Sequence, residues 1–200
     1  MRLRGAVCAV TVALATFGVA VAPAPATTAS CGPAKARTLA SSSQARVYEL
    51  KGVAYGCAGK TQYRLGRRQS PCSPCVGLVV VAGTVAAYSD YVGGYDFVDA
   101  EVHVRSLADG KRLFDRPAIT YEPRAEPVES VDSLVARPDG HVAWIAVSTG
   151  IGGPTHRLVE VHRGRTVLDH GPKIDPHSLK LQGMLLSWKH GSKTRHASLR

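Results

Sequence analysis

Residues 133–148, SLVARPDGHVAWIAVS, contain the local pattern that decides the fold. Two apolar runs flank the Pro138-Asp139-Gly140 triplet. Glycine accepts the positive φ that a tight hairpin turn requires, and aspartate tolerates it. The stretch therefore predicts a strand, a turn and a second strand that carries Trp144 into a core. These structural roles account for its residues, so we assign it no ligand-binding or catalytic role.

The same texture extends along the chain from Ala45 onward. Short runs rich in Val, Tyr, Leu and Trp alternate with Gly, Asp-Gly and Pro, and no stretch keeps a helical period for three turns. Apolar and polar residues alternate in EVHVRSL (101–107) and RLVEVHR (157–163), as in half-buried strands. A second Asp-Gly turn lies in LADGKRL (107–113). The sequence predicts an all-β fold.

An imperfect internal repeat organises these strands. A glycine followed shortly by a small residue and an aromatic recurs four times, ending at Tyr55, Tyr88, Trp144 and Trp188. Each copy has an apolar strand before the glycine, and a polar loop and another strand after the aromatic. We interpret each copy as a small antiparallel meander whose aromatic fills the space between sheets. One meander cannot bury that face alone, so the copies are expected to stack.

The best-preserved copy also carries a resemblance to a known class of repeat. ARPDGHVAW (136–144) resembles the core of TolB-type β-propeller repeats and their WD40-like relatives, with Ala136 where that pattern usually has serine. VVAGTVAAY (80–88) keeps only the shape, and the overall layout is similar to secreted bacterial proteins of unknown function. The resemblance implies a propeller-like stack of antiparallel meanders and no particular activity. Two full copies and two shorter ones leave a closed four-bladed ring, an open stack or a β-sandwich as alternatives.

The first residues predict export from the cytoplasm. A positive segment, Met1–Arg4, precedes an apolar run over 5–22, and alternating Ala and Pro then offer a cleavage site after Ala24 or Ala26. We therefore expect a signal peptide at 1–26, a flexible leader at 27–44 and a single all-β repeat domain at 45–200. The protein would be secreted or periplasmic, with no membrane span after cleavage. An uncleaved membrane anchor and a lipoprotein lipidated at Cys31 are the alternatives.

The cysteines that remain after cleavage fit an oxidising compartment. They are Cys31, Cys57, Cys72 and Cys75. Four such cysteines predict two disulfides in any of three pairings, tying the N-terminal segment to the first strands. Cys72 and Cys75 form a C-x-x-C motif, but the strand-like VGLVVVAG (76–83) follows where a redox motif would begin a helix. A thioredoxin-type site and a zinc site are therefore the weaker readings.

The basic charge is spread thinly. The formal net charge of +10 falls by two, to +8, when Arg2 and Arg4 leave with the signal peptide, and only 189–200 is locally dense in basic residues. We interpret this charge as a solvated basic surface, with attraction to an anionic envelope polymer as the alternative. No nucleic-acid partner is expected.

Sequence motifs indicate no catalytic residue, metal site or cofactor. The chain has no G-x-S-x-G, H-E-x-x-H or phosphate-binding glycine loop, and its eight histidines form no recognisable ligand pair. The best candidate is 87–101, AYSDYVGGYDFVDAE, where aromatic and acidic residues alternate in a basic chain. Such residues stack sugar rings and hydrogen-bond their hydroxyl groups. The candidate ligand-binding residues are Tyr91, Tyr95, Asp96 and Asp99; calcium binding and a plain structural hairpin are the alternatives.

Two classes of function follow. We expect a non-enzymatic extracellular binding module for a glycan, an anionic envelope polymer or another protein. The alternative is a secreted hydrolase or lyase that acts on a polysaccharide. Its acid and base would be two of Asp90, Asp96, Asp99 and Glu101.

Overall fold

The computed structural model describes residues 31–69, 71–94, 97–120, 128–150 and 157–200. The expected signal peptide, Tyr95 and Asp96 lie outside these residues. Regular structure within them is entirely β, which confirms the all-β class. Accordingly, they contain no helix that is long and apolar enough to cross a membrane. The strands are β1 (Arg37–Ser41), β2 (Ala45–Leu50), β3 (Val53–Ala58), β4 (Thr61–Arg67), β5 (Cys75–Ala82), β6 (Val85–Gly93), β7 (Val98–Ser106), β8 (Arg112–Pro117), β9 (Val128–Ala136), β10 (Val142–Thr149), β11 (Arg157–Arg163), β12 (Thr166–His170), β13 (Lys180–Gln182), β14 (Leu185–His190) and β15 (Lys193–Ser198).

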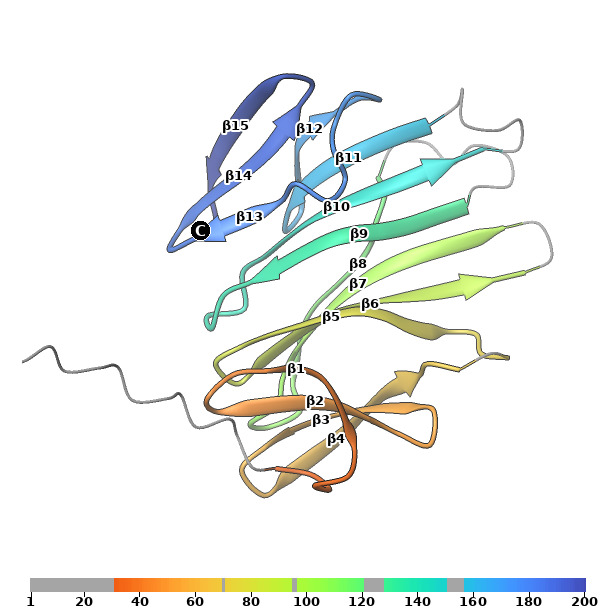
Figure 1. Cartoon of the computed structure of the whole chain (residues 1–200), viewed down its shortest axis with the longest axis vertical. Helices are drawn as coiled ribbons and strands as arrows, with labels where there is room; N and C mark the ends of the chain where they lie inside the picture. The colour runs from red at the N-terminus through yellow and green to blue at the C-terminus, as the bar shows by residue number, and fades with distance from the viewer. Residues whose placement is uncertain (1–30, 70, 95–96, 121–127, 151–156) are drawn as a thin grey trace, which may run out of the picture.

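The strands form successive antiparallel meanders, as the repeat predicts. We call β1–β4 meander 1, β5–β8 meander 2, β9–β12 meander 3 and β13–β15 meander 4. They follow one another along the long axis of the molecule (Figure 1). Meanders 1 to 3 belong to one 12-stranded sheet, joined by two parallel junctions of a single residue pair each, Arg67 with Cys75 and Val98 with Val128. Meander 4 is a separate three-stranded sheet.

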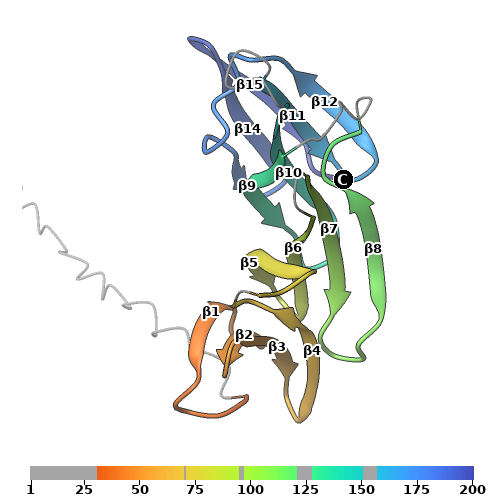
Figure 2. The same ribbon diagram turned by 90° about the vertical axis from the view of Figure 1, so that its right-hand side faces the viewer.

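The stack stays open. Meanders 1 and 4 lie at opposite ends of the molecule in both views (Figures 1 and 2). Within the described residues no sheet closes on itself and no ring of blades forms. The closed ring that the propeller resemblance allowed is therefore absent from this part of the chain. Closure would need a full fourth blade, and meander 4 has three strands.

The hairpin predicted at 133–148 is confirmed. Its two strands are β9 and β10, and the backbone N–H of Arg137 donates to the carbonyl of His141 (2.9 Å) across the turn. Gly140 has a φ of 89°. The Asp139 carboxylate accepts a hydrogen bond from the backbone N–H of His141 (3.2 Å), which explains the preference for Asp-Gly.

Strand β10 is buried on both faces, because meander 3 packs between meanders 2 and 4. Trp144 points into the core shared with meander 2, and Ile145 points into the core shared with meander 4. Trp144 is fully buried and donates its indole N–H to the Ala118 carbonyl (2.8 Å). Its ring stacks on His162 with 4.6 Å between ring centroids. The core between meanders 2 and 3 comprises Val85, Ala87, Ala100, Val102, Val104, Ala118, Ile119, Val131, Leu134, Val142, Trp144 and Ala146.

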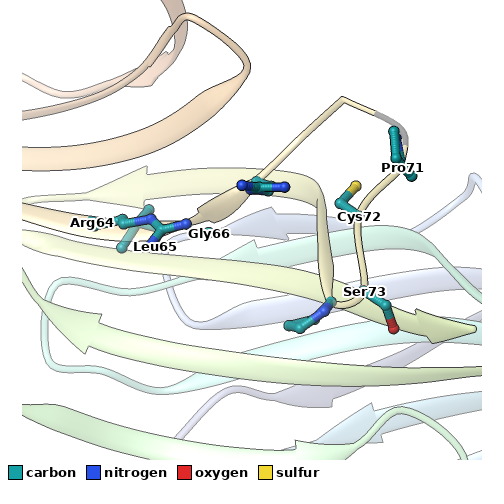
Figure 3. A pocket seen from close by; sticks show the side chains of 8 residues that line it. Arg64, Leu65, Gly66, Pro71, Cys72 and Ser73 are labelled. Carbon is teal, nitrogen blue, oxygen red and sulfur yellow. The ribbon is translucent and has the colours of Figure 1, made fainter.

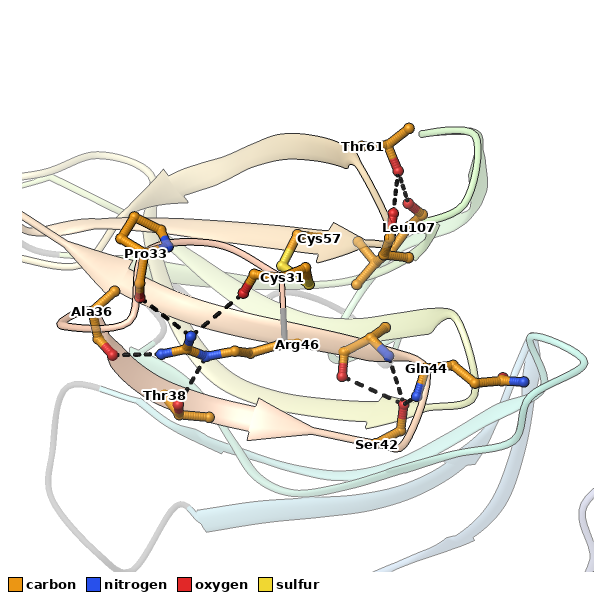
Figure 4. Close-up of a disulfide and its surroundings, with 12 residues drawn as sticks. Cys31, Pro33, Ala36, Thr38, Ser42, Gln44, Arg46, Cys57, Thr61 and Leu107 are labelled. Atoms are coloured by element: carbon orange, nitrogen blue, oxygen red, sulfur yellow. Dashed lines mark hydrogen bonds between the residues drawn. A yellow bond between two sulfur atoms is a disulfide. The ribbon is translucent and has the colours of Figure 1, made fainter. Parts of the chain in front are cut away.

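The N-terminal segment is more ordered than the expected leader. Residues 37–41 form β1, which pairs with β2, and a Cys31–Cys57 disulfide ties the segment to β3. The buried Arg46 guanidinium donates to the Thr38 hydroxyl (2.9 Å) and to the Ala36 carbonyl (2.5 Å) (Figure 4). The expected leader at 27–44 thus includes a strand, which is held by β2, Arg46 and Cys57 from outside the leader.

A polar junction joins meanders 3 and 4. The buried Asp169 carboxylate of β12 accepts hydrogen bonds from the Trp188 indole N–H (2.8 Å) and lies 3.0 Å from the His190 ring nitrogen. Arg195 is 3.4 Å away. Burial raises the pKa of Asp169, but these partners together outweigh burial, so the pKa is lowered from its ordinary value.

We predict that Trp144→Phe lowers the free energy of unfolding by about 1–3 kcal/mol, because it leaves the Ala118 carbonyl without its donor and opens space in the core. Urea unfolding followed by far-UV circular dichroism measures the loss. Tyr55→Phe, which changes a half-buried ring, is the control and should cost less. Equal losses would contradict the central packing role of Trp144.

We predict that Asp169→Asn reduces the dependence of stability on acidity. Since the folded pKa lies below the unfolded one, the charged carboxylate stabilises the fold fully above about pH 4 and loses this effect as pH falls through the folded pKa. The difference in unfolding free energy between wild type and variant should therefore shrink from pH 6 to pH 3. A difference that is constant over this range would refute the role of the charge.

Candidate functional site

Most described residues of the stretch predicted to bind a ligand lie in the paired antiparallel strands β6 and β7. Tyr91 packs half-buried against the core between meanders 2 and 3. Its hydroxyl oxygen lies 3.4 Å from both the backbone nitrogen and the carbonyl oxygen of Val131, and it accepts a hydrogen bond from the Ser89 hydroxyl (3.3 Å). These internal contacts favour a structural role for Tyr91 over the stacking of a sugar.

Asp99 lies at the surface, where it lines a cavity of about 320 Å³. Glu101 and Glu129 line the same cavity. Glu129 is half-buried and accepts a hydrogen bond from the backbone N–H of Ala100 (3.1 Å). Burial raises the pKa of Glu129, and this effect outweighs the hydrogen bond, which lowers it. The cavity thus combines a carboxyl group that holds its proton more tightly with two exposed acidic groups.

Glu129 was missed by sequence reasoning because it is far from 87–101 along the chain. It reaches the cavity through the parallel junction at which Val128 of β9 meets Val98 of β7. No local pattern in the sequence predicts a contact that rests on one residue pair between two meanders.

A histidine surrounded by carboxylates lies on the same strands. In the strand register Asp90 is opposite Glu101, and His103 is opposite Asp115. The His103 Nδ1 atom is 2.5 Å from an oxygen of Asp115, while Nε2 is 3.0 Å from Asp90 and 3.6 Å from Glu101. His103 is only 7% exposed. We call these four residues the His103 cluster.

The carboxylates of the His103 cluster favour the protonated, positively charged form of His103. Burial lowers the pKa of His103, but Asp90 and Asp115 raise it by more, so the net shift is upward. Burial likewise raises the pKa of Asp115, while Arg112 and His103 lower it by more. The cluster is therefore an acidic site that favours a cation at the imidazole.

A second, basic candidate site lies between β4 and β5. A cavity of about 580 Å³ lies between Arg64 of β4 and the loop that carries Cys72 (Figure 3), and Arg67 also lines it. Both arginines are exposed, and neither guanidinium group makes a hydrogen bond or ion pair with another described residue. A disulfide between Cys72 and Cys75 closes the loop. We call this site the arginine groove; its lining residues are Arg64, Leu65, Gly66, Arg67, Pro71, Cys72, Ser73 and Pro74.

A β-bulge places the two arginines on one face. Tyr55 of β3 pairs with Arg64, and Ala54 pairs with Gly66, so Leu65 is an extra residue in β4. Without the bulge, a spacing of three would put Arg64 and Arg67 on opposite faces of the strand. No sequence pattern predicts this bulge, so sequence analysis treats Arg64 and Arg67 as part of a dispersed basic surface.

The structure contains one of the three cysteine pairings that the sequence allows. Cys31 pairs with Cys57, and Cys72 pairs with Cys75. Disulfides persist in oxidising compartments, so this pairing indicates an extracellular or periplasmic environment.

Comparison of the chain with protein-family models, with curated proteins and with solved structures found no match. The candidate sites therefore rest on their own geometry.

Proposed function

We propose that the protein is a secreted or periplasmic binding module that holds an anionic polymer of the cell envelope in the arginine groove. The observation that carries this proposal is that Arg64 and Arg67 line a cavity of about 580 Å³ and that neither guanidinium group has a partner among the residues that the structure describes. Guanidinium groups present a planar fork of donors that matches carboxylate and phosphate groups.

The compartment supports this ligand class. The two disulfides indicate an extracellular or periplasmic environment, and a signal peptide at 1–26 would export the protein to where envelope polymers are found. A net charge near +8 after cleavage would raise the local concentration of a polyanion and speed its association. The basic surface would then attract the polymer, and the groove would position it.

The scaffold supports binding more than catalysis. The resemblance of 136–144 to propeller repeats enters the proposal only as an architecture that presents loops from stacked meanders. The loop over 71–74 is such an element, since the Cys72–Cys75 disulfide restricts it beside the groove. A restricted loop loses less conformational entropy when it binds.

We predict that replacing both Arg64 and Arg67 by Gln weakens binding to isolated cell envelope by about tenfold or more, because two charge-assisted hydrogen bonds are lost. Co-sedimentation of the mature protein with envelope, across a salt titration from about 50 to 500 mM, measures the effect. The matched control replaces Lys180 and Lys193 by Gln. These exposed lysines lie on meander 4, at the other end of the molecule, and their loss removes the same charge (Figure 1).

The two pairs of variants separate a shaped site from general attraction. Equal weakening by both pairs would mean that net charge alone draws the protein to the envelope, and the arginine groove would be rejected as the site. Wild-type protein that fails to sediment at any salt concentration would reject the whole proposal.

A second candidate function, a hydrolase or lyase acting on a polysaccharide, is favoured by the 320 Å³ cavity. Glu129, with its raised pKa, suits a general acid, and Asp99 or Glu101 would be its ionised partner. This pairing differs from the one expected from sequence, because Glu129 lines the cavity while Asp90 does not, and Asp96 lies outside the described residues.

For this second function we predict that any polysaccharide-cleaving activity falls by about 100-fold or more in Glu129→Gln, as for loss of a general acid. Release of reducing ends from envelope polysaccharides is the measurement. Asp132→Asn, an acidic residue of β9 outside the cavity lining, is the control. Activity that survives in Glu129→Gln would remove Glu129 from the mechanism, and a wild type without turnover would dismiss the enzyme.

A further inference from the structure

We propose that His103, Asp90 and Glu101 form a binding site for a divalent transition-metal ion, with Zn²⁺ as the best-fitting ion. Their ligand atoms all lie within 4.8 Å of one another, on the adjacent strands β6 and β7. The site is separate from the arginine groove, so either proposal can fail without the other.

The first argument is the orientation of His103. Its Nδ1 is 2.5 Å from a carboxylate oxygen of Asp115. That contact fixes the ring and places the Nδ1 proton toward Asp115, so the Nε2 lone pair is the one left to bind a metal. Arg112 holds the other Asp115 oxygen at 2.9 Å. A carboxylate that orients the far nitrogen of a ligating histidine is a recurrent feature of metal sites.

The second argument is the spacing of the ligand atoms. Two ligands that each lie about 2.0–2.1 Å from a tetrahedral metal ion are about 3.3 Å apart. The His103 Nε2 atom is 3.0 Å from Asp90 Oδ2 and 3.6 Å from Glu101 Oε2, which brackets this value. The ligand atoms of Asp90 and Glu101 lie within 4.8 Å of each other, so the three ligands can share one ion once the half-exposed Glu101 side chain closes on it.

The third argument is that the His103 Nε2 atom is buried without a hydrogen-bond partner. The side chain of His103 is 9% exposed, and carboxylate oxygens of Asp90 and Glu101 lie 3.0 Å and 3.6 Å from its Nε2 atom. The Asp90 Oδ1 atom is also buried without a hydrogen bond. Buried polar atoms normally have partners, and each exception needs an explanation. A metal ion facing Nε2 and the Asp90 carboxylate supplies one.

Charge and ligand type select the ion. Arg112 pairs with Asp115, which leaves Asp90 and Glu101 to balance two positive charges. The ion displaces a proton from the imidazole, because only neutral imidazole coordinates a metal. Imidazole suits Zn²⁺ and similar ions, whereas Ca²⁺ and Mg²⁺ prefer oxygen ligands alone. Sequence reasoning found no histidine pair here because the site uses one histidine and two acids from adjacent strands.

The site borders the acidic cavity. Glu101 lines the cavity of about 320 Å³ in addition to facing His103, and it is the more exposed of the two acidic ligands. Three protein ligands leave a fourth position for water or a bound molecule. A ligand in the cavity would then lie close to the ion.

The test is calorimetric titration of untagged protein, stripped of metal with EDTA, with ZnCl₂. We predict one equivalent of tight binding, a loss of about tenfold or more in affinity for Glu101→Gln, and a loss of that equivalent for His103→Gln. Glu101 is half-exposed, so its variant should fold. Asp115→Asn should weaken binding about 10- to 100-fold, as for a residue that orients a ligand. Asp132→Asn is the matched control and should bind as wild type does.

Two further outcomes decide the chemistry. Co²⁺ bound in place of Zn²⁺ should give visible absorption bands that disappear in His103→Gln, whereas equimolar Ca²⁺ should not compete. Folded wild type that binds no Zn²⁺, binding that persists unchanged in His103→Gln, or displacement by equimolar Ca²⁺ would each overturn the proposal. Circular dichroism of every variant confirms that a loss of binding is not a loss of fold.

Discussion

The stacking of meanders 2, 3 and 4 depends on the burial of both faces of meander 3. Strand β10 sends Trp144 into one core and Ile145 into the other, so neither face can remain in water. A meander of this kind is unstable alone and requires a neighbour on each side, which meanders 2 and 4 provide. The hydrogen bond from Trp144 to Ala118 links meander 3 to meander 2, and the polar junction at Asp169 links it to meander 4. Meanders 2, 3 and 4 therefore stack in that order.

The candidate sites lie where the meanders join. The arginine groove borders the junction of Arg67 with Cys75, and the acidic cavity borders the junction of Val98 with Val128. Each junction consists of one parallel residue pair. Beyond that pair the two strands are no longer hydrogen-bonded to each other, and the cavity lies beside this break in pairing. We expect functional sites at these junctions, because the rigid strands hold side chains that are not needed to pack the core.

The two candidate sites carry opposite charges. A basic chain offers Arg64 and Arg67 to an anion, while the His103 cluster gathers acidic groups around one buried imidazole. The two proposed sites would take ligands of opposite sign, an anionic polymer in the arginine groove and a metal ion in the His103 cluster. A basic surface that also holds an acidic cluster would keep an attracted polyanion away from the metal ligands and direct it to the groove.

The sequence by itself determined the local structure: the Asp139-Gly140 hairpin, the all-β class, the four aromatic repeats and the need for meanders to stack. These follow from side-chain alternation and from turn chemistry, which act over a few residues. Only the tertiary structure decided that the stack stays open, that a bulge at Leu65 aligns two arginines, and that Glu129 joins Asp99. These three features depend on strand register and on contacts between meanders, and neither can be predicted from the spacing of residues in the sequence.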